Sequence, residues 1–231
     1  MGRAQRTTVG NTIYHVINRA NGKQKIFHKD YDYKAFVKIL VEAKEKIAMR
    51  ILAFCIMPNH WHLVLYPYKN NDLSRFIQWV TLTHTQRWHA HYESVGFGHL
   101  YQGRFKSFPI QEDEHCITMT RYVERNALRA KLVTKAEDWS WGSAWLNEYG
   151  NEKQLQLLSP WPVPKPESYL EFLNTELPHE EEIVEDIRFV TKRGRPFGDE
   201  YWTMQTAKKF GLESTMRTTG RPKKGVRHPF Y

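Results

Sequence analysis

Cysteine and long apolar runs are both scarce in this sequence. The 231 residues include two cysteines, Cys55 and Cys116, which lie far apart and form no C-x-x-C pair. A disulfide scaffold and a cysteine-rich zinc site are therefore excluded, and both thiols are expected to be buried in a reducing compartment. No apolar run approaches the roughly 20 residues of a membrane helix, and the first residues do not resemble a secretory signal. These absences predict a cytoplasmic protein with no membrane contact.

Positive charge is abundant and gathers at the two ends of the sequence. The net charge is +9, and lysine and arginine outnumber the acids in residues 1–25 and again in residues 188–231. Clustered cations gain affinity for a polyanion because they release counterions from its phosphates, although a basic surface can also simply favour solubility. The residues at both ends that we expect to contact a nucleic acid are Arg3, Arg6, Arg19, Lys192, Arg193, Arg195, Arg221, Lys223 and Lys224.

The hydrophobic pattern of the first two thirds changes repeatedly between strand and helix periods. It predicts strands at 12–18, 50–56 and 60–66 and helices at 30–47, 72–92 and 114–128. Residues 99–110 are rich in strand formers around Gly103, which indicates a bulge or an irregular hairpin before the last strand. The order strand, helix, strand, strand, helix, strand is that of a ferredoxin-like α+β domain. We therefore predict an antiparallel sheet with helices packed on one face.

The last third of the sequence has a different character. Residues 157–166 are rich in proline, which indicates a domain edge in this part of the chain. Helical spacing returns in residues 179–193 and 199–213, before a basic end. The sequence thus predicts a first domain of residues 1–150 and a mostly helical, basic C-terminal extension of residues 151–231.

His60 and His62 flank one apolar residue at the start of the third predicted strand. Side chains two positions apart on a strand share a face, so these imidazoles are close enough to hold one metal ion, while Trp61 points into the core. An H-x-H pair also arises by chance. His89 and His91 form one in a helical stretch, where the two side chains diverge. The strand setting makes His60 and His62 the candidate metal ligands.

Tyr122 and Asn126 lie four positions apart on a predicted helix, which stacks them on one face. Arg121, Arg125 and Arg129 form a neighbouring stripe of positive charge, and we expect Arg121 and Arg125 to contact the nucleic acid. A tyrosine hydroxyl in this setting can attack a phosphodiester, because nearby cations or a metal favour the phenolate over the weakly nucleophilic phenol. The structural alternative is a half-buried aromatic residue and an asparagine near a helix end.

A divalent metal would assist such an attack. It polarises a non-bridging phosphate oxygen and offsets the charge that develops during in-line displacement. Two imidazoles, from His60 and His62, and the amide oxygen of Asn126 form a mixed nitrogen and oxygen ligand set. That set suits Mg²⁺ or Mn²⁺ better than a closed structural zinc site, which would need more cysteine or histidine.

Several segments together resemble one protein family. They occur in the expected order over most of the chain and read TIYHVINRANGKQKIF, MPNHWHLV, HLYQGRFKS, RYVERNALRAKLV, DWSWGSAW, RGRPFGDEYW and AKKFGLESTMRTTGRPKKG. With H-hydrophobe-H on a strand and a tyrosine on a later helix, the sequence resembles the HUH single-tyrosine transposases, and within them the REP-associated tyrosine transposases.

The resemblance implies a ferredoxin-like fold and a function. It implies that His60 and His62 bind the divalent metal, with Asn126 as the third ligand. Tyr122 would attack a phosphodiester in single-stranded DNA, leaving a 5′-phosphotyrosine and a free 3′-hydroxyl that can rejoin the strand. The implied partners are hairpins of repeated extragenic palindromes with a short flanking guide sequence. The chain departs from the family at Ala127, where a proline often follows the asparagine; alanine extends the helix and leaves the ligand assignment unaffected.

Three further residues are weaker candidates. Arg104 and Lys106 follow the expected bulge and either grip phosphates or are solvated charges at a strand edge. His15 lies either near the metal, as a hydrogen-bond partner that does not bind the ion itself, or in the strand as a hydrogen-bonded interior histidine.

Two other functions fit parts of the pattern. A regulator that binds hairpin DNA without turnover would use the metal and Tyr122 for affinity at most. A metal-dependent hydrolase using activated water would not depend on the tyrosine, but it lacks a third histidine or carboxylate ligand. Related insertion-sequence transposases act as dimers that exchange tyrosine helices, whereas the long extension of this chain could hold that helix in place. We therefore predict a monomer.

Overall fold

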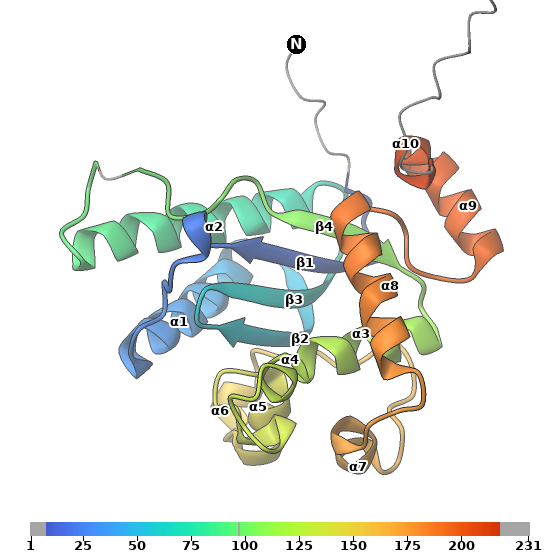
Figure 1. Cartoon of the computed structure of the whole chain (residues 1–231). Helices are drawn as coiled ribbons and strands as arrows, with labels where there is room; N and C mark the ends of the chain where they lie inside the picture. The colour runs from blue at the N-terminus through green and yellow to red at the C-terminus, as the bar shows by residue number, and fades with distance from the viewer. Residues whose placement is uncertain (1–7, 97, 218–231) are drawn as a thin grey trace, which may run out of the picture.

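The computed structural model describes residues 8–96 and 98–217 and contains a four-stranded antiparallel sheet in the order β2-β3-β1-β4 (Figure 1). The strands are β1 (Ile13–Arg19), β2 (Met49–Met57), β3 (His60–Pro67) and β4 (Lys106–Ile110). The two helices that connect them are α1 (Asp30–Lys46) and α2 (Asp72–His91). The chain order β1-α1-β2-β3-α2-β4 is the predicted one, and the α+β class with an antiparallel sheet is confirmed.

The remaining elements follow β4 along the chain. They are α3 (Glu114–Glu124), α4 (Asn126–Arg129), α5 (Ser143–Tyr149), α6 (Glu152–Leu155), α7 (Tyr169–Asn174), α8 (Glu180–Arg193), α9 (Glu200–Phe210) and α10 (Glu213–Met216). Short 3-10 turns lie at Asn21–Lys23, between β1 and α1, and at Ala136–Asp138, between α4 and α5. The prediction of one unbroken helix at 114–128 is wrong, because Arg125 has φ −80° and ψ 0° and separates α3 from α4. This break lies between the candidate nucleophile and the candidate amide ligand.

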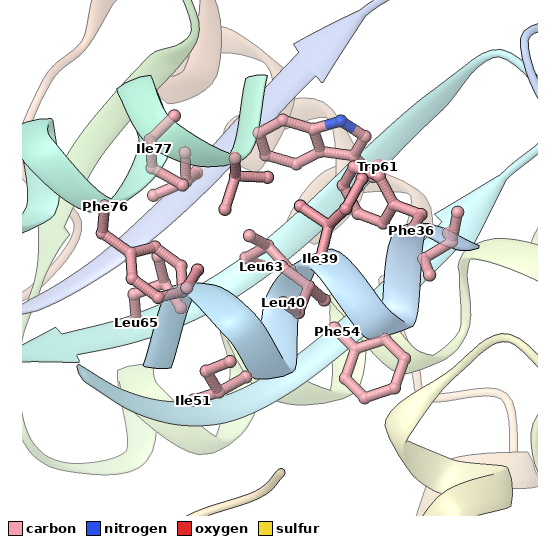
Figure 2. Close-up of a cluster of buried hydrophobic side chains, with 14 of the residues drawn as sticks. Phe36, Ile39, Leu40, Ile51, Phe54, Trp61, Leu63, Leu65, Phe76 and Ile77 are labelled. Atoms are coloured by element: carbon pink, nitrogen blue, oxygen red, sulfur yellow. The ribbon is translucent and has the colours of Figure 1, made fainter. Parts of the chain in front are cut away.

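One face of the sheet packs against α1 and α2. Figure 2 shows Trp61, Leu63 and Leu65 of β3 pointing toward Phe36 and other apolar side chains of these two helices. Side chains alternate along a strand, so these three β3 residues share one face of the sheet, and His60 and His62 lie on the other face. The predicted burial of Trp61 is confirmed, since its side chain is fully enclosed.

The opposite face is covered as well, which corrects the prediction of helices on one face. Val64 of β3 and Phe108 of β4 lie in a second apolar cluster with Val123 of α3 and Ile187 of α8. The physical reason is that β2 and β3 are buried along almost their whole length, so both faces need an apolar layer. Helices α3 and α8 thereby lie on the face that carries the candidate histidines (Figure 1).

Two smaller sequence predictions concern cysteines and the segment before β4. Both thiols are free and buried, as expected, and burial raises the pKa of Cys55 and of Cys116 to about 12. Within 99–110, where a bulge or an irregular hairpin is expected, Tyr101 makes only an isolated bridge to Ala20, and regular strand pairing begins at Lys106. Within residues 8–96 and 98–217, no helix combines the length and apolarity needed to cross a membrane.

Candidate active site

The strand alternation of β3 brings His60 and His62 together on the α3 side of the sheet. Their ring centroids are 5.0 Å apart and the rings are nearly perpendicular. The Nδ1 atom of His60 lies 2.6 Å from Oδ1 of Asn59, which leaves the Nε2 atom of His60 for another ligand. A fixed partner on one ring nitrogen is the usual way in which a metal-binding histidine is oriented.

His62 is held in the same way by a third histidine. Nε2 of His15, on β1, lies 2.8 Å from Nδ1 of His62, and the two rings stack with centroids 5.1 Å apart. If Nδ1 of His62 donates this hydrogen bond, its Nε2 keeps a free lone pair for a metal ion. Nδ1 of His15 is buried and has no hydrogen-bond partner among the described residues. His15 therefore contacts a candidate ligand directly, as one of its two predicted roles requires.

Burial keeps these histidines neutral at physiological pH. Desolvation lowers the pKa of His15 to about 3 and, with a smaller effect of Arg19, that of His60 to about 4. Desolvation, followed by the neighbouring histidines and Arg129, holds the pKa of His62 well below 6.5. A neutral imidazole is the form that binds a metal ion, so no proton has to be displaced from these rings near pH 7.

Helix α3 places Tyr122 against the histidine pair. The Tyr122 ring centroid is 5.9 Å from that of His62 and 6.3 Å from that of His15, both in edge-on contacts. The guanidinium carbon of Arg129 also lies over the Tyr122 ring, 4.3 Å from its centre. The candidate nucleophile is thus packed between the histidines and one cation.

Asn126 occupies the first position after the helix break. Its side-chain nitrogen donates to the carbonyl oxygens of Tyr122 and Val123, at 3.2 and 3.0 Å, and its Oδ1 accepts from Nη2 of Arg129 at 2.8 Å. An amide oxygen has two lone pairs, so this hydrogen bond leaves one for a cation. The residues present therefore fit a divalent ion held by two imidazole nitrogens and one amide oxygen.

A basic pocket of about 630 Å³ contains all four candidate residues. Its wall has six lysine or arginine side chains and, among the described residues, no carboxylate. These cations are Arg19, Arg104, Lys106, Arg129, Arg188 and Lys192. Nε of Arg19 is buried without a hydrogen-bond partner in the described part of the chain. Such a surface suits a phosphate group, since nothing on it repels negative charge.

Comparison with known families decides what kind of protein carries this pocket. Residues 8–126, more than half of the chain, match the sequence profile of the family described as transposase IS200-like. The chain belongs to the IS200-like transposase family. The match includes both histidines, Tyr122 and Asn126.

One solved structure agrees with this assignment at the level of the fold. A REP-associated tyrosine transposase bound to a REP hairpin aligns with 77% of this chain and 95% of its own, with 17% sequence identity and a TM-score of 0.51. A provisionally named transposase from Deinococcus radiodurans R1 aligns with 54% of this chain and 97% of its own, at 17% identity and a TM-score of 0.37, which adds nothing to the argument. No curated protein sequence is significantly similar to the chain.

The transposase pocket includes only part of the predicted DNA-binding set. Arg19, Arg104, Lys106 and Lys192 line it, while Arg195 does not. Five predicted residues lie outside the described residues: Arg3, Arg6, Arg221, Lys223 and Lys224.

For Arg121 and Arg125 the predicted DNA contact is wrong. Both are buried, and both donate to the Glu180 carboxylate, at 3.0 and 2.9 Å. They also donate to backbone carbonyls of residues 172–175, so their polar groups are used within the protein. Arg193 likewise donates to the carbonyl oxygens of residues 214, 215 and 217, and it helps to hold α10 rather than facing the pocket.

Sequence reasoning missed Arg188 and did not separate Arg129 from its neighbours. Arg188 and Lys192 are one helical turn apart on α8 and both line the pocket. Their spacing was visible in the sequence, but nothing in it linked α8 to the strand that carries the histidines.

Asp113, Glu114 and His115 form a separate group whose potential ligand atoms lie within 4.8 Å of one another. This group is at the start of α3. Oδ1 of Asp113 accepts from the backbone N–H of His115 at 2.9 Å and lies 2.8 Å from Nδ1 of the same residue. These contacts are those of a helix cap, and the group supplies no residue to the basic pocket.

Proposed function

We propose that this transposase nicks and rejoins single-stranded DNA through a covalent bond to Tyr122. The observation that carries the proposal is the position of Tyr122 beside His62 in a basic pocket with no carboxylate among its described lining residues. In the first step the Tyr122 oxygen bonds to phosphorus, and the bond from phosphorus to the 3′ oxygen breaks. The phenol loses its proton and the released strand gains one as a 3′-hydroxyl. Attack by a 3′-hydroxyl on the phosphotyrosine reverses these steps and rejoins DNA.

The cations of the pocket have two roles in this reaction. Arg129 lies against the ring of the nucleophile, and its positive charge would offset the negative charge on the Tyr122 oxygen as that oxygen attacks phosphorus. Arg19 and Lys106, on the strands, and Arg188 and Lys192, on α8, surround the space in which a phosphate would lie. Fixed positive charge stabilises the additional negative charge of the transition state without having to reorganise.

His60, His62 and Asn126 would hold the divalent metal, Mg²⁺ or Mn²⁺. Their Nε2 atoms and amide oxygen form the mixed donor set described above, and the partners of His60 and His62 orient both rings. When bound, the ion supplies Lewis-acid polarisation of a non-bridging phosphate oxygen. The residues around it position the scissile phosphate against Tyr122.

The proposed substrate is hairpin DNA of the repeated extragenic palindrome type. The support is twofold: the solved transposase that shares this fold was bound to a REP hairpin, and the chain carries its excess charge at its two ends. Cleavage would require an unpaired segment next to the hairpin, because Tyr122 needs access to a phosphodiester in a flexible strand. Such a substrate places the reaction in the cytoplasm.

We also propose that one chain forms the complete site. The Glu180 carboxylate, at the start of α8, ties Arg121 and Arg125 of the tyrosine helix to the C-terminal extension of the same chain. This contact would hold Tyr122 over its own histidines. Light scattering after size exclusion should give the mass of a monomer, and a stable dimer would contradict this part of the proposal.

The decisive experiment is an assay for an SDS-resistant protein–DNA adduct. Wild-type and Tyr122→Phe protein are mixed with labelled single-stranded hairpins from the host's intergenic repeats, in Mg²⁺, Mn²⁺ or EDTA. A metal-dependent adduct that forms only with the wild type supports the proposal. Cleavage that survives Tyr122→Phe would indicate a hydrolase using activated water. Binding without adduct or cleavage would indicate a regulator.

A further inference from the structure

Another cavity lies on the α1 side of the sheet, away from the basic pocket. It has a volume of about 810 Å³, within the range of about 300–1,000 Å³ that is usual for small-molecule sites. It runs along α1 from Asp30 to Glu45, and the segments 140–146 and 153–157 bound its other side. We call it the α1 pocket. It shares no lining residue with the basic pocket, so it serves no step of the proposed reaction.

The α1 pocket has an apolar and aromatic base. Phe54 and Leu157 are buried there, and Figure 2 shows Phe54 beside α1. Two half-buried indoles, Trp141 and Trp145, add flat surfaces. Trp141 is fixed in place because its ring stacks on Tyr33, with centroids 4.8 Å apart and an interplanar angle of 14°. Rigid indole rings can bind the flat ring of an aromatic ligand through offset-stacked or edge-on contacts.

The charged residues of the α1 pocket differ in their exposure. Four are exposed, so water screens their charges: Asp30, Lys34, Glu45 and Lys153. Lys44 is half-buried, and its Nζ atom donates to the carbonyl oxygens of Gln156 and Leu157, both at 2.9 Å. An ammonium group has three protons, so one has no acceptor among the described residues.

Lys44 also lacks a counter-charge. Burial lowers the pKa of its ammonium group, and no carboxylate of the described chain opposes that shift. An anion in the α1 pocket would supply both the missing acceptor and the missing negative charge. The pocket therefore favours a ligand that combines a flat apolar body with an anionic group.

We propose that the α1 pocket binds a small aromatic carboxylate, with its ring against Trp141 and Trp145 and its carboxylate on Lys44. One half-buried cation balances a charge of one, so it suits a carboxylate better than a phosphate, which carries up to two charges at neutral pH. The bound ligand would join α1 to the segments 140–146 and 153–157, and it would stabilise the folded chain.

The test compares cinnamate with cinnamamide, which has the same ring and a similar shape but no charge. Ligand-observed NMR titration measures the affinity of each probe for the whole chain without DNA. The variants are Lys44→Met, which removes the charge, and Lys44→Arg, which keeps it. Two controls remove cations outside the α1 pocket: Lys38→Met, at an exposed position of the same helix, and Arg188→Gln, in the basic pocket.

We expect the wild type to bind cinnamate about tenfold more tightly than cinnamamide, because a hydrogen bond between charged groups adds roughly that much. Lys44→Met should abolish this preference, whereas Lys44→Arg and both controls should retain it. Equal affinity of the wild type for the two probes, or binding of neither, would overturn the proposal, and that comparison requires no variant to fold. A preference lost in Arg188→Gln and kept in Lys44→Met would also overturn it, because cinnamate would then bind in the basic pocket.

Discussion

Arg129 contacts Tyr122 at two points, with its guanidinium carbon 4.3 Å from the ring centre and its Nη2 atom 3.2 Å from the Tyr122 carbonyl oxygen. The same Nη2 atom donates to Oδ1 of Asn126 at 2.8 Å. One guanidinium therefore links the proposed nucleophile to a proposed metal ligand across the break between α3 and α4. Burial lowers the pKa of Arg129, yet its neighbours in the pocket give it no carboxylate partner among the described residues. Its charge is thus available to the reaction.

The first prediction concerns this charge. Arg129→Gln should slow formation of the Tyr122 adduct by about 10²- to 10³-fold, the usual loss when one preorganised electrostatic contact is removed. DNA affinity should fall far less, because five other cations of the pocket stay in place. Single-turnover kinetics at saturating DNA measures the rate separately from binding.

A matched variant separates this role from a general loss of positive charge. Arg188→Gln removes a cation from the same pocket, but one for which no contact with Tyr122 is found in the described residues. It should weaken DNA binding and leave the adduct rate at saturation within about tenfold of the wild type. If Arg129→Gln and Arg188→Gln reduced that rate equally, Arg129 would have no special relation to the nucleophile.

A second prediction concerns His15 and metal affinity. His15→Leu removes the acceptor that keeps Nε2 of His62 free, and it should weaken Mn²⁺ binding by about 10- to 100-fold. His15→Gln offers a side-chain oxygen in place of the ring nitrogen and should retain most of the affinity. Isothermal titration of the DNA-free protein with Mn²⁺ measures this effect independently of cleavage. Unchanged affinity in His15→Leu would assign His15 to packing alone.

The sequence predicted the parts of this site that depend on local geometry. Strand alternation alone places His60 and His62 on one face and Trp61 on the other, and the structure has this arrangement. The helix positions of Tyr122 and Asn126 were also correct, although the break at Arg125 was not visible in the pattern. Helix spacing of four residues survives such a break because only one residue departs from helical geometry.

The roles of the arginines could not be predicted, because they depend on contacts between distant segments. A stripe of Arg121, Arg125 and Arg129 indicates a shared face but not what the face contacts. Glu180, more than 50 residues away, pairs with the first two, and only Arg129 reaches the pocket. The error of placing helices on one face has a related origin, since part of the cover of the second face is α8, which comes from the distant extension.

A third prediction concerns the ion pairs that join α3 to α8. Glu180→Gln leaves two buried guanidiniums without a counter-charge and should lower the free energy of unfolding by about 3–5 kcal/mol. The control is Arg87→Ala, which breaks an exposed pair with Glu42 and should cost no more than about 1 kcal/mol. Urea unfolding of both variants gives the comparison. Similar losses in the two would mean that Glu180 does not anchor the tyrosine helix.

The last prediction concerns pH and a histidine outside the pocket. Nδ1 of His84 is buried 2.7 Å from the hydroxyl of Tyr101, which accepts from Nε1 of Trp61 at 2.9 Å, so Tyr101 donates to a neutral His84. Burial lowers the pKa of His84 to about 3. The unfolded chain therefore binds a proton below about pH 6.5 that the folded protein does not bind until about pH 3. This contribution to stability is complete above pH 6.5 and is lost as the pH falls, at up to about 1.4 kcal/mol per pH unit.

His84→Asn keeps an acceptor for Tyr101 and removes this titration. Its free energy of unfolding should be lower than that of the wild type at pH 7, because packing is lost, but it should fall less steeply between pH 6 and pH 4, by about 1.4 kcal/mol per pH unit. Urea unfolding at a series of pH values measures both slopes. The pH dependence of stability that remains in His84→Asn should include contributions from His15, His60 and His62, because burial lowers their pKa values as well. Identical slopes in wild type and His84→Asn would mean that His84 is protonated in the folded protein, and the hydrogen bond from Tyr101 could not exist as described.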